Sequence, residues 1–283
     1  MRDPVSVPEV AARKRARGAP PVVMVTAYDA PFARIVDEAG VDIILVGDSV
    51  GNNVLGYENS LGVDLGQMVH HVGAVARAKP GALIVGDMPW MSYHVDPADT
   101  VRNAAALVRA GAQAVKLEGG RRRIPAVRAI LDAEIPVMGH LGLTPQSVHA
   151  LGGFVVQGKD AEGAGELELD AQALVGAGCF ALVLEGVPDL VASRVTATIP
   201  VPTIGIGAGP DCDGQVLVLH DLLGLSTGRP PKFVRRYADL ATASREAIAR
   251  FAADVRSGDY PSAAETYHAS ADLRRKLGLG PEG

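Results

Sequence analysis

Residues 114–118 read AVKLE, a short run in which charged and apolar residues alternate. Successive side chains of a β-strand point to opposite faces, so Lys116 and Glu118 would share one face of a strand here. The apolar Val115 and Leu117 would share the other. A strand that carries a cation and an anion side by side on one face needs an explanation, which the rest of the chain supplies.

The whole chain repeats this kind of apolar run, and helical patterns lie between most of the runs. Continuous apolar runs of this length are typical of parallel strands covered on both sides. Eight strands alternating with helices predict an α/β fold of the (β/α)8 TIM-barrel type, formed by residues 1–283 as a single domain. We expect an N-terminal helix within residues 1–20 and a helical tail over 232–283. The predicted strands are 22–28, 42–48, 82–87, 114–118, 137–141, 180–185, 203–207 and 215–220, and the predicted helices are 30–39, 64–78, 97–110, 123–133, 168–177 and 188–198.

Three connections depart from a regular barrel. Residues 207–215 are too few for a helical crossover, so either the seventh helix is reduced to a turn or the eighth strand is wrongly placed. Residues 50–63 and 144–166 are long loops after the second and fifth strands. Long loops at one end of a barrel are candidate lids over an active site.

Composition excludes several classes of protein. The formal net charge of −5 argues against a general nucleic-acid binder, and we interpret the basic run 13–17 as a solvated helix end. No apolar run approaches the roughly 18 residues of a membrane span. Cys179 and Cys212 lack metal-binding spacing, and Ser6 to Glu9 is typical of a capping box rather than a signal peptide. We expect a cytoplasmic protein.

Acidic residues recur where the predicted strands end. In a TIM barrel the carboxyl ends of the strands carry the active site, and Asp48, Asp87, Glu118 and Glu185 lie there. Each acid alone could be a helix cap or a turn former. Three carboxylates on adjacent strands would repel one another without a cation, so their recurrence favours a hard divalent cation, Mg²⁺ or Mn²⁺.

Two further polar residues are placed inside the predicted barrel. Lys116 would lie one layer below Glu118, and a buried lysine must be paired or functional. It could form a structural salt bridge, hold an anionic substrate, or form a Schiff base with a ketone. His140 is either a satisfied core histidine or a site residue. The GIGAG run, 205–209, has no neighbouring Lys or Arg, so close packing explains its glycines better than phosphate binding.

Longer stretches of the sequence resemble the ketopantoate hydroxymethyltransferase family, also called 3-methyl-2-oxobutanoate hydroxymethyltransferases. The resemblance covers about 200 residues in the expected order. The stretches that carry it are TAYDAPFARIVDEAGVDIILVGDSVGNNVLGY (26–57), GDMPWMSY (86–93), AVKLEGG (114–120), PVMGHLGLTPQSVHALGGFVVQGK (136–159), ALVLEGVP (181–188) and PTIGIGAGPDCDGQVLVLHDLLGL (202–225).

This resemblance implies a barrel of the phosphoenolpyruvate mutase/isocitrate lyase-like type and a Mg²⁺-dependent enzyme of pantothenate and coenzyme A biosynthesis. It implies transfer of a hydroxymethyl group from 5,10-methylenetetrahydrofolate to the 2-oxoacid 3-methyl-2-oxobutanoate, which gives ketopantoate and tetrahydrofolate. It also implies a homodecamer. From the net charge and the lack of a membrane span we expect no nucleic-acid or membrane partner. By the same resemblance Asp48, Asp87 and Glu118 hold the metal, Asp48 and Asp87 also lie at the substrate, Ser49 and Lys116 bind its carboxylate, and Glu185 is the general base. His140 is a possible additional site residue.

Three alternative functions remain open from the sequence. One is a Mg²⁺-dependent oxoacid C–C lyase of the isocitrate lyase type, which a reactive cysteine in a strand-end loop would favour. Another is a Schiff-base aldolase that uses Lys116. The third is a barrel without catalytic activity, which would be expected to lack some of the matched site residues.

Overall fold

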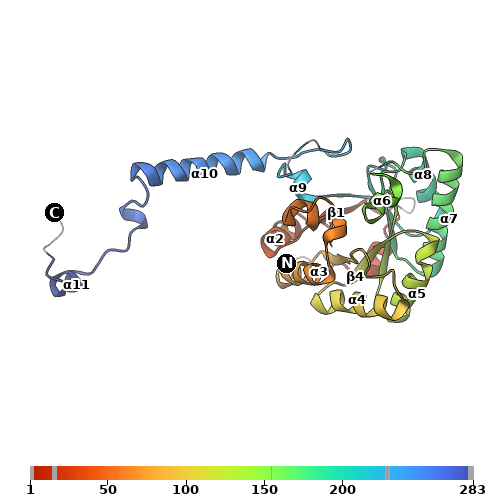
Figure 1. The fold of residues 1–283 in the computed structure, drawn as a ribbon, viewed down its shortest axis with the longest axis horizontal. Helices are drawn as coiled ribbons and strands as arrows, with labels where there is room; N and C mark the ends of the chain where they lie inside the picture. The colour runs from red at the N-terminus through yellow and green to blue at the C-terminus, as the bar shows by residue number, and fades with distance from the viewer. Residues whose placement is uncertain (1–2, 15–17, 154, 227, 229, 280–283) are drawn as a thin grey trace.

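The computed structural model describes residues 3–14, 18–153, 155–226, 228 and 230–279, and its centre is a closed parallel barrel (Figure 1). Each strand pairs in parallel with the next along the chain, and the eighth pairs with the first. The predicted (β/α)8 barrel is confirmed. The strands are β1 (Val22–Thr26), β2 (Ile43–Val46), β3 (Leu83–Asp87), β4 (Ala114–Glu118), β5 (Val137–Gly142), β6 (Ala181–Glu185), β7 (Thr203–Ile206) and β8 (Gly214–Leu217).

Helices surround the barrel, and the six predicted crossover helices are all present. None of the helices in the described part of the chain is both long and apolar enough to span a bilayer. The α-helices are α1 (Val7–Ala11), α2 (Ala30–Glu38), α3 (Leu65–Arg77), α4 (Pro97–Ala110), α5 (Ile124–Asp132), α6 (Val148–Leu151), α7 (Ala161–Ala177), α8 (Asp189–Thr198), α9 (Leu219–Leu222), α10 (Leu240–Ser257) and α11 (Ala271–Lys276). Shorter helices include η2 (Gly51–Leu55) and η3 (Ser60–Gly62) in the loop after β2, and η5 (Pro145–Ser147) after β5.

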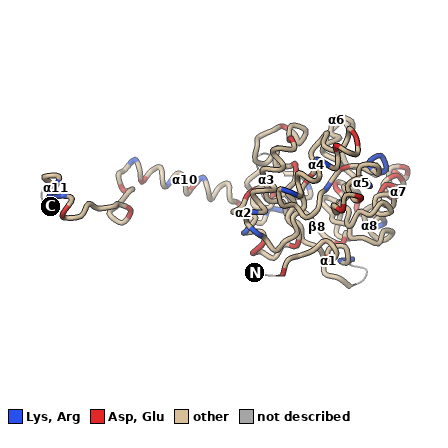
Figure 2. Tube along the Cα trace, turned by 90° about the horizontal axis from the view of Figure 1, so that it is seen from below, with Lys and Arg blue, Asp and Glu red and all other residues tan. Residues whose placement is uncertain are grey.

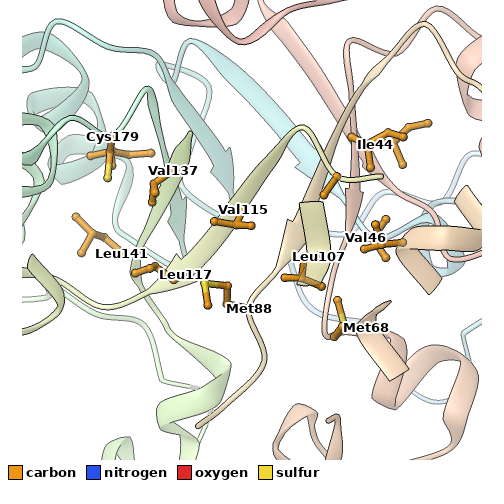
Figure 3. Close-up of a cluster of buried hydrophobic side chains, with 14 of the residues drawn as sticks. Ile44, Val46, Met68, Met88, Leu107, Val115, Leu117, Val137, Leu141 and Cys179 are labelled. Carbon is orange, nitrogen blue, oxygen red and sulfur yellow. The ribbon is translucent and has the colours of Figure 1, made fainter. Parts of the chain in front are cut away.

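Strand β4 shows how the apolar pattern builds two cores. Val115 and Leu117 point outward and pack under the helices together with Leu107 of α4 (Figure 3). Ala114 faces the barrel interior and belongs to a separate cluster with Met24 and Met138. Lys116 and Glu118 lie on the Ala114 face because side chains alternate along a strand. The polar residues of β4 therefore lie inside the barrel mouth, above an apolar interior.

The connection between β7 and β8 resolves the short crossover noted in the sequence. Residues 207–213, all of them described, contain no helix, so the seventh helix is absent there. The eighth strand exists where it was expected to begin, but it ends at Leu217 and not at 220, because α9 starts at Leu219. Gly214 permits the tight closure onto β1, because a Cβ at this position would lie 2.4 Å from the carbonyl oxygen of Val22.

Helix α7 begins seven residues earlier than the sequence predicts. Its N-cap is Asp160, whose side chain accepts a hydrogen bond from the Gly163 amide at 2.8 Å. Gly163 and Gly165 lower intrinsic helix propensity, which is why the pattern favoured a loop here. Gly163 lies close to Gly158, since a Cβ on it would be 3.3 Å from the Gly158 Cα, so a tight contact with the preceding loop favours glycine at this position.

The N-terminal segment covers the end of the barrel where the strands begin, and its Val5 and Val10 pack in the interior apolar cluster. Its basic run differs from what the sequence predicts. Its capping box between Ser6 and Glu9 is confirmed. The basic run was expected to be solvated, but Lys14 is buried and its Nζ lies 2.7 Å from Asp213 Oδ2 and 2.5 Å from the Thr196 carbonyl oxygen. The neighbouring Arg13 pairs with Asp42 at 2.7 Å. The rest of the run, 15–17, lies outside the described residues.

The C-terminal arm, α10 and α11, extends away from the barrel in both views (Figures 1 and 2). Backbone hydrogen bonds from Tyr237 to Leu222 and from Leu240 to Leu223 fix the start of the arm on α9. Beyond that point α10 buries none of its residues, and the apolar side chains of Ile248, Phe251 and Val255 are exposed.

We predict that Lys14→Met destabilises the fold by about 3–5 kcal/mol, because it leaves the buried Asp213 carboxylate without its cation. Denaturant unfolding followed by circular dichroism measures the change. Arg102→Met is the matched control, since Arg102 forms an exposed pair with Asp99 and its loss should change stability by about 1 kcal/mol or less. Equal small effects in the two variants would contradict a structural role for Lys14.

Candidate active site

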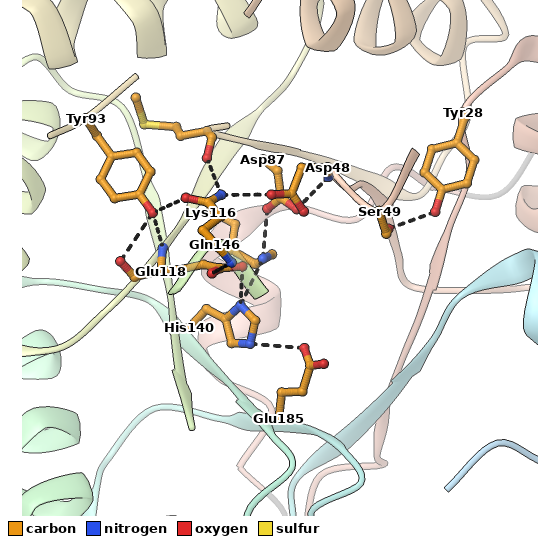
Figure 4. A network of polar contacts seen from close by, with 11 residues as sticks. Tyr28, Asp48, Ser49, Asp87, Tyr93, Lys116, Glu118, His140, Gln146 and Glu185 are labelled. Atoms are coloured by element: carbon orange, nitrogen blue, oxygen red, sulfur yellow. Dashed lines mark hydrogen bonds and ion pairs between the residues drawn. The ribbon is translucent and has the colours of Figure 1, made fainter. Parts of the chain in front are cut away.

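The register of the strands brings the predicted site residues together at the carboxyl end of the barrel. Asp87 of β3 is the register partner of Lys116 in β4, and Glu118 is the partner of His140 in β5. Glu185 ends β6 beside Gly142. Because all these strands are parallel, their polar ends meet at one mouth, shown in Figure 4.

Lys116 is the central cation of this mouth. Its Nζ lies 2.9 Å from Asp87 Oδ1, and both side chains are almost completely buried. Burial favours the neutral amine, but the Asp87, Glu118 and Asp48 carboxylates outweigh it and raise the pKa of Lys116. The lysine is therefore held as an ammonium ion. This state suits binding of an anion and does not suit a Schiff-base nucleophile, which must be deprotonated.

His140 joins two acids on opposite sides of its ring. Its Nδ1 lies 3.3 Å from Glu118 Oε1, and its Nε2 lies 3.3 Å from Glu185 Oε2. Burial and the nearby Lys116 oppose protonation, yet the close contacts with the two acids raise the pKa of His140 to about 9. The Lys116 Nζ also lies 3.2 Å from His140 Nδ1, so the ring links the lysine and the two acids. The site role of His140 is favoured over that of a core histidine.

Asp48 and Ser49 follow β2 and turn toward the same mouth. The backbone amide of Asp48 donates to Asp87 Oδ2 at 3.1 Å, and Ser49 Oγ lies 2.8 Å from Tyr28 Oη. Gly47 makes this turn possible, because a Cβ on it would lie 2.9 Å from Ser49 Oγ and 3.3 Å from Asp87 Oδ2. Ser49 and Asp87 thus approach each other across a residue that has no side chain.

Two residues that sequence reasoning did not single out, Gln146 and Tyr93, complete the network. The Gln146 side-chain amide donates to Asp48 Oδ2 at 2.8 Å, and its backbone amide donates to Glu118 Oε2 at 3.0 Å. Tyr93 Oη donates to Gln146 Oε1 at 2.6 Å, which fixes the orientation of the amide. Both residues lie in stretches that resemble the family, but a neutral amide in a loop carries no chemical signal of its own.

The acids of this site suit a hard cation in donor type and charge. Within the described chain no group of three or more His, Cys, Asp or Glu side chains has converged on a metal position. Lys116 contacts Asp87, and Gln146 contacts Asp48. Burial, together with the neighbouring Asp87 and Glu118 carboxylates, raises the pKa of Asp48 well above its usual value. A divalent cation would relieve this repulsion, and the donors are all oxygen atoms.

The GIGAG run packs as the sequence predicts. A Cβ on Gly205 would lie 3.0 Å from the Cys212 sulfur, and one on Gly207 would lie 2.6 Å from the Phe233 ring. Close packing of the chain therefore accounts for these glycines, as expected from the lack of a neighbouring Lys or Arg.

Comparison with known proteins identifies the family. A family model described as ketopantoate hydroxymethyltransferase matches residues 5–263. The chain belongs to the ketopantoate hydroxymethyltransferase family. It is 57% identical over 256 residues to a 3-methyl-2-oxobutanoate hydroxymethyltransferase of Methylobacterium sp. (strain 4-46), covering 90% of this chain and 89% of that protein. A protein of the same name from Pyrobaculum calidifontis is 57% identical over 247 residues, covering 87% of this chain and 93% of that one.

Solved structures agree on the fold of this ketopantoate hydroxymethyltransferase family member. The chain resembles 2,3-dimethylmalate lyase, a PEP mutase/isocitrate lyase superfamily member, with a TM-score of 0.59 at 17% identity over 97% of this chain and 95% of that one. It also resembles a phosphonopyruvate hydrolase solved with oxalate and Mg²⁺, with a TM-score of 0.59 at 12% identity over 96% of this chain and 95% of that one. These likenesses confirm the predicted barrel type.

We predict that neither thiol reacts with iodoacetamide in the folded protein at pH 8. Burial raises the pKa of Cys179 to about 12 and also raises the pKa of Cys212, so very little thiolate is present at either position. Mass spectrometry of the native and the urea-unfolded protein after equal exposure measures the labelling. A fast-reacting Cys212 in the native protein would instead favour the lyase alternative.

Proposed function

We propose that this chain transfers a hydroxymethyl group from 5,10-methylenetetrahydrofolate to 3-methyl-2-oxobutanoate, giving ketopantoate and tetrahydrofolate. The observation that carries the proposal is the His140 bridge between Glu118 and Glu185. The bridge places the partly exposed Glu185 carboxylate beside the buried cluster of Lys116, Glu118 and His140. Enolisation needs such a base next to groups that can hold the charged substrate. The names of the relatives support the same activity, and the C–C lyase alternative fits them less well.

In this proposal the oxoacid lies over Lys116. The ammonium of Lys116 and the hydroxyl of Ser49 bind the substrate carboxylate, since both groups donate hydrogen bonds and Lys116 also supplies charge. The carboxylates of Asp48, Asp87 and Glu118 would hold Mg²⁺. When bound, this ion supplies Lewis-acid chemistry that polarises the ketone of the substrate. Gln146 keeps Asp48 and Glu118 at a fixed separation.

Glu185 is the general base of the proposed reaction. Its carboxylate removes the C3 proton of the oxoacid, and the C3–H electron pair becomes available for bond formation. C3 then bonds to the methylene carbon of the folate, whose two carbon–nitrogen bonds break, and the two nitrogens take up one proton from Glu185 and one from water. Water supplies the hydroxyl oxygen, so the balance is oxoacid, methylenetetrahydrofolate and water in, ketopantoate and tetrahydrofolate out. His140 acts as a positioning residue that orients Glu185.

We predict that the protein exchanges the C3 proton of 3-methyl-2-oxobutanoate in D₂O without folate when Mg²⁺ is present. Removal of the metal with a chelator should slow this exchange by about 100-fold or more, because ketone polarisation is lost. Proton NMR follows the C3 signal in both conditions. Exchange that persists in chelator, together with inactivation by borohydride and substrate, would move the chemistry to a Lys116 Schiff base.

We predict that Glu185→Gln lowers hydroxymethyl transfer and C3 exchange by about 10²- to 10⁴-fold, because the amide cannot accept the proton. Binding of Mg²⁺, measured by calorimetry, should remain, since Glu185 is not among the proposed ligands. Glu168→Gln is the matched control, because Glu168 pairs with Arg194 on the outside of the barrel. Turnover near the parent level in Glu185→Gln would remove Glu185 from the role of base.

A further inference from the structure

A large cleft opens beside Glu185, on the side away from Lys116 and Asp87. Its volume is about 810 Å³, which lies in the range of sites for drug-sized ligands. Its walls are mainly apolar and include Leu143, Val187, Pro188 and Phe233. The oxoacid site described above does not use this cleft.

We propose that this cleft, which we call the Glu185 cleft, binds the reduced pteridine and aminobenzoyl rings of the folate cosubstrate. The inference rests on the proposed function, which requires a second, ring-bearing substrate next to the base. Glu185 is the residue that both sites share, because it contacts His140 in the polar cluster and also lines the cleft. A ring bound there presents its methylene carbon to the carbon from which Glu185 removes the proton.

Gly207 and Gly209 contribute backbone to the lining of the Glu185 cleft, and we call this part its floor. Gly207 and Gly209 have positive φ angles of 62° and 81°, which disfavour residues with a Cβ. A Cβ on Gly207 would lie 2.6 Å from the Phe233 ring, and one on Gly209 would lie 2.6 Å from the Asp189 Cβ. The Phe233 ring therefore packs directly on the backbone while remaining 37% exposed. An aromatic wall beside a backbone floor is suited to a planar heterocycle, which gains from stacking.

Two charged residues at the Glu185 cleft match the ends of a folate. The Asp189 carboxylate lies at the first turn of α8, where its Oδ1 accepts the Leu190 amide at 2.8 Å. Its Oδ2 can accept an N–H of the aminopyrimidinone edge of a pterin. Lys232 lies on the exposed rim, where its ammonium can pair with the carboxylates of the glutamate tail. The apolar walls and these opposite charges together select a long ligand with a hydrogen-bond-donating end and an acidic end.

A second cavity at the mouth fits this ligand less well. It measures about 420 Å³ and is lined by Tyr93, Glu118 and the arginines 121–123. Glu185 does not line it, so a ring bound there would place its methylene carbon away from the proposed base. The position of Glu185 therefore selects the apolar cleft.

The test measures binding of 5-formyltetrahydrofolate, a stable reduced folate, by calorimetry, together with the KM values of both substrates. Phe233→Ala should weaken folate binding and raise the KM for methylenetetrahydrofolate by about tenfold or more, leaving the KM for the oxoacid within about twofold. Lys232→Ala, an exposed substitution that the fold tolerates, should weaken folate binding several-fold. Leu190→Ala is the control, because Leu190 neighbours Asp189 but is 80% exposed and does not line the cleft.

The outcomes separate this inference from the proposed function. Measurable folate-free C3 exchange by a variant shows that its barrel is folded. If the parent protein transfers hydroxymethyl groups but the Phe233 and Lys232 variants bind the folate as tightly as the parent does, the cleft assignment is overturned and the function stands. If the parent protein enolises no oxoacid and transfers no hydroxymethyl group, the proposed function itself is overturned, and this inference with it.

Discussion

Charge balance inside a closed barrel is the constraint on which the site depends. The Lys116 ammonium and the His140 ring face the carboxylates of Asp48, Asp87, Glu118 and Glu185 in a mouth from which most water is excluded. Lys116 forms an ion pair with Asp87, and His140 contacts both Glu118 and Glu185. Asp48 is left with a neutral amide partner and a raised pKa. The alternating pattern of β4 explains how this arrangement folds, since each inward polar residue is matched by an outward apolar one.

Much of this organisation could be predicted from the sequence because strand periodicity is a local property. The runs around Asp87, Lys116 and Glu118 fix which face each side chain occupies, and the parallel topology then brings them together. Gln146 could not be predicted, because its role depends on where a loop places a neutral amide between two strands. Lys14 was misjudged for a related reason. Its partner, Asp213, lies 199 positions further along the chain, and a basic run considered alone is typical of a solvent-exposed segment.

The mouth divides into two chemically different halves, and Glu185 lies at their boundary. On one side the buried ions favour a small, charged oxoacid. On the other side Phe233 and the glycine backbone favour a large, planar and weakly polar molecule. In the proposed reaction Glu185 would contact both substrates. The 18% exposure of the Glu185 side chain, against 3% for His140, is consistent with that position.

The ion pair between Lys14 and Asp213 also has a consequence for how the chain is made. The two residues are separated by 199 positions in sequence, so the lysine emerges from the ribosome long before its partner exists. Until then it stays hydrated, and the N-terminal segment cannot cover the bottom of the barrel without burying an unpaired charge. Asp213 directly precedes β8, so the partner that makes burial of Lys14 favourable enters the chain together with the strand that closes the barrel onto β1.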